Sequence, residues 1–153
     1  MRFDGLELSA PDDFVVEETT IALRAPPGPT ESRILQKQFP IRPNLIMNRK
    51  RVGLGATLAL LTAEVTAELA STIIGLRALA TDEIRFDDGC EGIIVSFEFP
   101  MREVASVRQF HALRLDDGIF TDVTLTVDGM TLNEAAKAKW LTVLSSARRE
   151  SKS

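Results

Sequence analysis

Hydrophobic and polar residues alternate most regularly in the last third of the chain, from Gly92 to Ala147. Apolar side chains fall at every second position of the segment before Pro100, namely at Ile93, Val95, Phe97 and Phe99. A period of two is typical of a strand with one buried face, and we expect Pro100 to end this strand. Ser106 to Leu115 and Ile119 to Val127 predict two more strands. Between them lies Asp116-Asp117-Gly118, where Asp-Gly supplies the positive φ values of a two-residue hairpin turn.

A helix is predicted after the third of these strands. Asp128-Gly129 ends the strand, and Thr131 with Glu134 matches a capping box, in which a hydroxyl and a carboxylate bind the first amide groups of a helix. We expect the helix to run from about Leu132 to Ala147. Apolar residues recur along it at helical spacing: Leu132, Ala136, Trp140, Val143 and Ala147. This stripe can lie across the apolar side of the sheet.

The first third of the chain predicts shorter strands. Leu6 to Leu8 and Thr19 to Arg24 alternate in the strand pattern, and Ser32 to Phe39 is expected to be extended. The segment from Pro26 to Pro43 is rich in proline, which argues against a helix there. Asn44 to Arg49 contains three consecutive large apolar residues, so we expect a strand that is buried on both faces.

Between these two regions lies a second predicted helix. Ala56 to Thr72 is rich in alanine, which favours a helix, and its buried stripe is expected at Leu58, Leu61, Val65 and Leu69. Gly75 can end it, and a strand then runs to Phe86. Asp87-Asp88-Gly89 repeats the turn chemistry of the later hairpin. The order of elements predicts an α+β fold: an antiparallel β-sheet, including a four-stranded meander, flanked by two main helices.

Composition limits the classes of function. The 153 residues fit one domain, which we place at residues 1–148, followed by a flexible C-terminal tail at 149–153. A net charge of −4 argues against nucleic acid as the main partner. The single cysteine gives no internal disulfide, and no apolar run reaches the roughly 20 residues of a membrane span. The N-terminus lacks the apolar core of a signal peptide, so we expect a cytoplasmic protein that is not embedded in a membrane.

Few residues offer catalytic chemistry. Cys90 lies next to a turn and His111 lies in the middle of a strand, and both are interpreted as structural because a zinc site needs about four ligands and a thiol nucleophile needs an adjacent base. The acidic pairs at residues 12–13, 87–88 and 116–117 stand where turns favour aspartate. Arg49-Lys50-Arg51, with Arg42 nearby, is either a solvated loop or a site for an anion or an acidic partner. We therefore predict a protein that is not an enzyme and needs no metal or other cofactor.

The second face of the sheet is the remaining candidate for function. From the alternation we assign to it Ile94, Ser96, Glu98, Thr124 and Thr126. Such a mixture of small, polar and apolar side chains either meets solvent or forms a binding surface.

Several short segments resemble the bacterial DcrB-like domain family. They are residues 107–111 (Val-Arg-Gln-Phe-His), 113–118 (Leu-Arg-Leu-Asp-Asp-Gly), 125–127 (Leu-Thr-Val), 139–141 (Lys-Trp-Leu) and 48–49 (Asn-Arg). The resemblance covers roughly Leu6 to Arg148. It implies the helix-flanked antiparallel sheet, an α/β/α sandwich, that this family shares with the PsbP protein of photosystem II and a Ran-binding nuclear transport factor.

The chain is similar in length, acidity and lack of a leader to the Eag chaperones of type VI secretion systems. In those proteins a dimer cradles the hydrophobic N-terminal transmembrane segments of a toxic effector before export. The resemblance therefore implies a homodimeric chaperone whose client contacts include Ile21 and Leu23, with Met47, Gln109 and His111 on other strands. The region from Pro26 to Pro43 is longer and richer in proline than the family pattern. The alternative that we keep open is an interaction module of the PsbP or Ran-binding kind that contacts a soluble partner through loops and charge.

Overall fold

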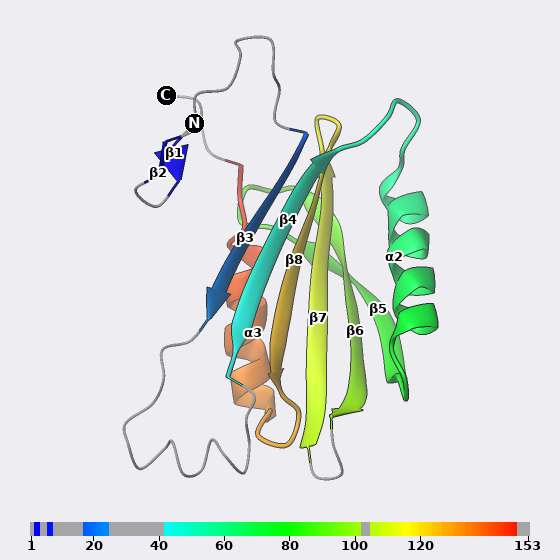
Figure 1. The fold of residues 1–153 in the computed structure, drawn as a ribbon, viewed down its shortest axis with the longest axis vertical. Helices are drawn as coiled ribbons and strands as arrows, with labels where there is room; N and C mark the ends of the chain where they lie inside the picture. Colours follow the sequence, from blue (N-terminus) through cyan, green and yellow to red (C-terminus); the bar gives the residue numbers. More distant parts are fainter. Residues whose placement is uncertain (1, 4–5, 8–16, 25–41, 102–104, 150–153) are drawn as a thin grey trace.

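A six-stranded antiparallel sheet forms the centre of the molecule (Figure 1). The computed structural model describes residues 2–3, 6–7, 17–24, 42–101 and 105–149. The strand order is β3-β4-β8-β7-β6-β5, and β5 to β8 form the predicted meander. The strands are β3 (Glu18–Arg24), β4 (Asn44–Arg51), β5 (Arg77–Arg85), β6 (Glu91–Met101), β7 (Ala105–Asp116) and β8 (Ile119–Asp128). A separate pair joins β1 (Arg2–Phe3) to β2 (Leu6–Glu7). The predicted α+β class with an antiparallel sheet is confirmed.

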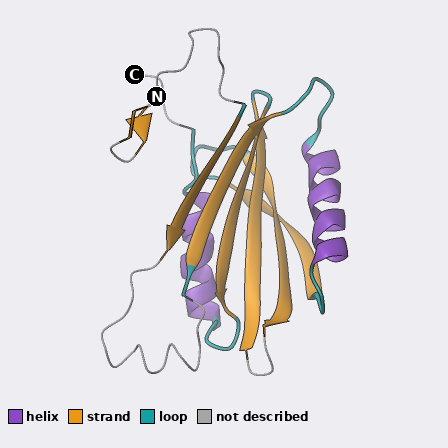
Figure 2. Cartoon of the chain, viewed as in Figure 1, coloured by secondary structure: helices purple, strands orange, loops and turns teal. Residues whose placement is uncertain are grey.

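The two described helices, α2 (Leu58–Thr72) and α3 (Glu134–Ser145), lie on opposite faces of this sheet (Figures 1 and 2). Leu61 of α2 packs against Val95 and Phe97 of β6, whereas Leu144 of α3 packs in a cluster that includes Ile94. Neighbouring residues of a strand point to opposite faces, so each helix covers one face. Both faces of the strands in the middle of the sheet are therefore buried.

The register of the strands corrects our assignment of the two faces. Val95 pairs with His111, and His111 pairs with Thr124. Directly opposed residues point to the same face, so Thr124 and Thr126 share the face of Val95. Ile94, Ser96 and Glu98 lie on the other face, and the predicted grouping of these five residues is wrong. The alternation within a strand defines two faces, but only the pairing between strands shows which faces join.

The hairpin turns follow the predicted chemistry. Asp117 and Gly118 have φ values of 48° and 71°, so both central residues of the β7–β8 turn have the left-handed backbone that a type I′ turn requires. Pro100 does not end β6, which continues to Met101 and pairs with β7 through Ser106. The first residue of β5, Arg77, pairs with Glu98, so Pro100 has no partner residue in β5. Its missing N–H is tolerated because β6 is an edge strand at that point.

The N-terminus of α3 differs from the predicted capping box. Asn133 caps this helix, and its side-chain oxygen accepts the N–H of Ala136 at 2.8 Å. Thr131 instead donates its hydroxyl to the carbonyl of Asp128 at 3.4 Å. The buried stripe is also shifted, because Leu144, which has no exposed surface, packs in the core in place of Val143. The stripe of α2 agrees with the prediction, since Leu58, Leu61, Val65 and Leu69 all pack against one cluster.

β4 is less buried than its run of apolar residues predicts. Ile46 is 40% exposed, and Arg49, Lys50 and Arg51 are exposed as well. β4 lies near the edge of the sheet, with only β3 beyond it, so the prediction of a strand covered on both faces is wrong. The predictions for residues 12–13 and 32–39, and for Leu8 at the end of the first strand, fall outside the described residues.

Candidate functional site

One face of the sheet carries a helix over only part of its width. α2 contacts β6 and β7 on this face. Six strands about 4.8 Å apart span roughly 24 Å, whereas neighbouring helices pack about 8–10 Å apart. A face of this width can accommodate two helices side by side. No helix of the described part of the chain lies over β3 and β4 on this face (Figure 1), and of β8 only Phe120, near its start, belongs to the cluster of α2.

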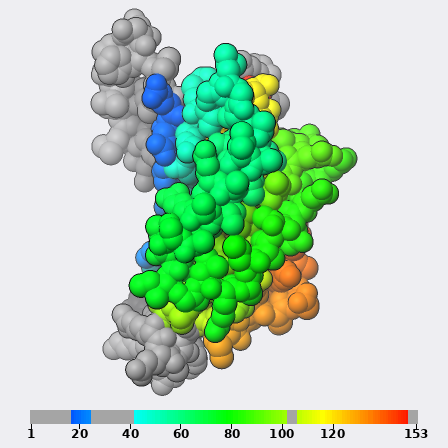
Figure 3. All heavy atoms as spheres, turned by 90° about the vertical axis from the view of Figure 1, so that its right-hand side faces the viewer, coloured from blue at the N-terminus to red at the C-terminus, as the bar shows by residue number. Residues whose placement is uncertain are grey.

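We call this area the open slot. Its floor is formed by the side chains of neighbouring strands that point to the α2 face: Thr20, Ala22, Ile46, Asn48, Thr124, Thr126, Gln109 and His111. Ile46 is the large apolar residue among them and is 40% exposed. α2, which contacts β7, borders this area on one side, and Figure 3 looks onto the outer side of this helix. The floor thus takes residues from four neighbouring strands, β3, β4, β8 and β7, and carries small and mixed side chains.

The polar groups on this floor bond mainly to one another. His111 Nδ1 lies 2.9 Å from Asp122 Oδ2, and the Thr124 hydroxyl donates to Asp122 Oδ1 at 3.1 Å. Gln109 Nε2 donates to the Thr126 hydroxyl at 2.9 Å. A polar group that already has a hydrogen bond costs much less to remove from water than an unpaired one. This floor can therefore be covered by an apolar surface at a modest desolvation cost.

Two threonines of α2 also use their hydroxyl groups within the structure. Thr62 and Thr66 each donate a hydroxyl to the carbonyl oxygen four residues earlier in the helix, both at 2.7 Å. Their hydrogen-bonding capacity is used within the helix, which leaves the methyl groups for contact with other surfaces.

The structure does not bring the five predicted client residues together. Ile21 pairs with Met47, and both lie on the α3 face beside Leu23, which is 62% exposed. Gln109 and His111 lie on the α2 face, and His111 is buried. Met47 lies on β4, the neighbour of the strand of Ile21, but β8 separates β4 from β7, so Gln109 and His111 are two strands farther away.

Sequence reasoning missed the other members of the open slot. Ala22 and Ile46 oppose each other across β3 and β4 and share the α2 face. Ala22 and Ile46 are next to Ile21 and Met47 in the sequence and therefore point to the opposite face. In each segment the alternation places more large apolar residues on the face of Ile21 and Met47, so the pattern favours that face. The signal that could have revealed them is the three consecutive apolar residues 45–47, since such a run places an apolar residue on each face.

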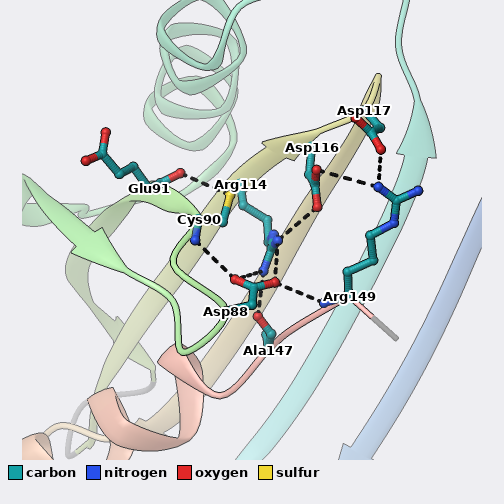
Figure 4. A network of polar contacts seen from close by, with 8 residues as sticks. All are labelled: Asp88, Cys90, Glu91, Arg114, Asp116, Asp117, Ala147 and Arg149. Carbon is teal, nitrogen blue, oxygen red and sulfur yellow. Dashed lines mark hydrogen bonds and ion pairs between the residues drawn. The ribbon is translucent and has the colours of Figure 1, made fainter. Parts of the chain in front are cut away.

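A second cluster joins the two Asp-Asp-Gly turns (Figure 4). Arg114 of β7 is 5% exposed and donates to Asp88 at 2.8 Å, to Asp116 at 3.0 Å and to the carbonyl of Ala147 at 2.8 Å. Arg149 forms ion pairs with Asp116 and Asp117, although it lies in the segment predicted to be a tail. The turns are therefore held together and to the end of α3 by one buried guanidinium.

The charges of this cluster shift its ionisation. The hydrogen bond from Arg114 lowers the pKa of Asp88 from 3.8 to about 2, against the effect of burial, and the backbone N–H groups of Arg149 and Cys90 add to the lowering. Burial by itself would lower the pKa of Arg114, but the hydrogen bonds to Asp88 and Asp116 outweigh it and raise this pKa. Burial raises the pKa of the Cys90 thiol, which disfavours the thiolate that a nucleophile needs.

A small cavity opens next to this cluster, with a volume of about 130 Å³. Four arginines line it, from β4, from β7 and from the segment after α3: Arg49, Arg114, Arg148 and Arg149. Asp116 also lines it, together with the apolar groups of Met47, Ile119 and Ala147. We call this cavity the arginine pocket. Arg49 belongs to the basic cluster that the sequence indicated as a possible anion site.

Two further features limit the chemistry of the described residues. Among them, no three histidine, cysteine, aspartate or glutamate side chains come together in a way that could hold a metal ion. Neither of the two helices is long and apolar enough to cross a bilayer in the ranges that the structure covers.

Comparison with known proteins gives a match in structure only. No family model and no curated protein matches the sequence. Among solved structures, the chain is similar to PA94 from Pseudomonas aeruginosa, a protein of unknown function named as a candidate regulator. The TM-score is 0.68 at 14% sequence identity, and the match covers 99% of this chain and 96% of PA94. The similarity shows that the two proteins share a fold over nearly their whole length.

Proposed function

We propose that this protein is a cytoplasmic chaperone that binds and shields an apolar helix, specifically the hydrophobic N-terminal segments of a type VI secretion effector. The observation that carries the proposal is the open slot, a sheet face on which α2 covers β6 and β7 but no described helix covers β3, β4 and the part of β8 beyond Phe120. The resemblance of the sequence to the Eag chaperones supports the choice of client.

The dimensions of the slot suit one helix lying along the strands. A transmembrane helix of about 20 residues is about 30 Å long. Strands of 8 to 10 residues, as in β4 and β8, are about 26–33 Å long at 3.3 Å per residue. Each large aliphatic side chain that a client buries there contributes about 1.5–3 kcal/mol. Because the polar groups of the floor already bond to one another, little of this gain is lost to desolvation.

We further propose that the protein acts as a homodimer. In this proposal the client helix contacts the sheet on one side and α2 on another. A client helix would still expose its remaining surface to water, which is unfavourable for an apolar segment. A second copy of the chain that faces the first would enclose it.

Two aspartate substitutions on opposite faces of the β3–β4 edge test the slot. Ile46→Asp places a charge on the floor, whereas Leu23→Asp is the matched control on the α3 face. Both side chains are exposed, at 40% and 62%, so both variants are expected to fold. The probe is a fusion protein with a 20-residue leucine–alanine segment, co-expressed with the chain and recovered by affinity pull-down. Ile46→Asp should lower recovery at least tenfold, because a buried carboxylate costs more than about 1.4 kcal/mol.

Circular dichroism of both variants and light scattering of the complex complete the experiment. Loss of recovery with Leu23→Asp instead of Ile46→Asp would move the client to the α3 face. Full recovery with both folded variants would contradict the chaperone proposal. A complex with one copy of the chain per client would contradict the dimer.

A further inference from the structure

The arginine pocket lies apart from the open slot and suggests a second binding site. Met47 and Arg49 are on the α3 face of β4, since they alternate with Ile46 and Asn48 along this strand. The slot floor is on the other face of the sheet. A ligand of the pocket therefore does not compete with a helix in the slot.

The pocket has positive charge that the described residues do not neutralise. Arg114 is held by Asp88 and Asp116, and Arg149 is held by Asp117 and Asp116. Arg49 and Arg148 also line the cavity, but neither forms an ion pair with any residue that the structure describes. Asp116, the acidic residue in the lining, accepts from Arg114 at 3.0 Å and lies 3.8 Å from Arg149. Two guanidinium groups thus remain for an anion.

The size and walls of the pocket indicate the kind of anion. Its volume of about 130 Å³ has room for several water molecules or for one acidic side chain. Met47 and Ile119 supply apolar wall next to the arginines, and this suits the aliphatic stem of a glutamate. Guanidinium groups bind carboxylates with paired hydrogen bonds. The net charge of −4 disfavours a strongly anionic surface such as a membrane, because the whole chain is repelled from it.

We propose that the arginine pocket binds a glutamate side chain of an acidic peptide segment in a partner protein, with Arg49 and Arg148 as the ligands of the carboxylate. The site is independent of the client slot. It provides a docking point for a partner that engages the protein while the slot is occupied.

Fluorescence anisotropy with the full chain tests this site. The probe is a labelled, end-capped peptide with two adjacent glutamates between leucines, and the control peptide has glutamines in their place. Arg49→Gln should weaken binding of the acidic peptide about tenfold, as expected for the loss of one charge-assisted hydrogen bond. Lys50→Gln is the matched control, since it removes the same charge from the next residue, which does not line this pocket. Arg148→Gln provides a second variant outside the sheet.

The outcomes separate the possible ligands. The site is supported if Arg49→Gln and Arg148→Gln weaken binding of the acidic peptide and Lys50→Gln does not. Equal binding of the glutamine peptide, or equal losses with Arg49→Gln and Lys50→Gln, would overturn it. Binding of phosphatidylserine-containing vesicles that depends on Arg49, without binding of the acidic peptide, would assign the pocket to a membrane surface instead.

Discussion

Asp88, in the turn between β5 and β6, forms an ion pair with Arg114 of β7 at 2.8 Å. The two residues are 26 positions apart, and the pair joins one Asp-Asp-Gly turn to the other. Arg114 also lies over the ring of Phe86, with the guanidinium carbon 4.9 Å from the ring centroid. This side chain therefore links the polar cluster at the end of the sheet to the hydrophobic core.

The Asp88–Arg114 pair predicts a pH-dependent part of the stability. The folded state holds the pKa of Asp88 at about 2, below its ordinary value of 3.8. The ionised carboxylate thus stabilises the fold fully above about pH 4, and this contribution is lost as the pH falls from 3.8 towards 2. Asp88→Asn should lower the free energy of unfolding at pH 7 by about 1–2 kcal/mol, allowing for the partial exposure of the pair. Urea unfolding between pH 7 and pH 2.5 should show the difference shrinking at acid pH.

Asp87→Asn is the matched control for this experiment. Asp87 is exposed, and its side chain makes no ion pair with the residues that the structure describes. Its substitution should change the unfolding free energy by less than about 0.5 kcal/mol. A constant difference between Asp88→Asn and the parent across the pH range would contradict the role of the Asp88 charge.

Gly92 near the start of β6 has no room for a side chain. A Cβ atom there would lie 2.4 Å from the carbonyl oxygen of Leu113 and 2.5 Å from a ring carbon of Phe86. One of these neighbours belongs to the backbone of β7 and cannot move aside without disturbing the sheet. Gly92→Ala should therefore cost about 2–3 kcal/mol. Thermal unfolding measures this loss. Gly53→Ala, in a loop with nothing within 4 Å of the new methyl group, is the control and should be close to neutral in the same assay.

Most elements of this fold could be predicted from local patterns in the sequence. The Asp-Gly turn at 117–118 defines its hairpin because its backbone needs positive φ, and few residue pairs supply it. The alanine-rich α2 is recognisable from its composition and from the spacing of Leu61, Val65 and Leu69. These features depend only on residues close together in the chain.

The arrangement of the binding surfaces could not be predicted in the same way. Whether Ile21 or Ala22 faces the open slot depends on the register in which β3 pairs with β4. A shift of this register by one residue would bring the other side chain to that face. Likewise, the turn residue Asp88 reveals its ion pair with Arg114 only when β5–β6 and β7–β8 are placed together. Such contacts between distant segments leave no local pattern in the sequence.

Asn133 is predicted to contribute more to the start of α3 than the residues of the apparent capping box. Its side chain accepts the N–H of Ala136, one of the amide groups that would otherwise lack a partner. Asn133→Ala should lower the free energy of unfolding by about 1 kcal/mol. Thr131→Ala removes only a hydroxyl that lies 3.4 Å from the carbonyl of Asp128 and should have less than half of this effect. A larger loss of unfolding free energy for Thr131→Ala than for Asn133→Ala, measured by urea unfolding, would support the predicted capping box instead.

Leu144 and Val143 offer a direct test of how α3 packs on the sheet. Leu144 is fully buried with Phe110 and Leu125, whereas its neighbour Val143 is only half-buried and lies outside this cluster. Leu144→Ala should leave a cavity in the core and cost about 2–5 kcal/mol. Val143→Ala should cost less than about 1 kcal/mol, because it removes apolar atoms that already touch water. If urea unfolding gave the larger loss for Val143→Ala, α3 would have to be rotated by about 100° from the arrangement described here, since neighbouring helix residues differ by that angle.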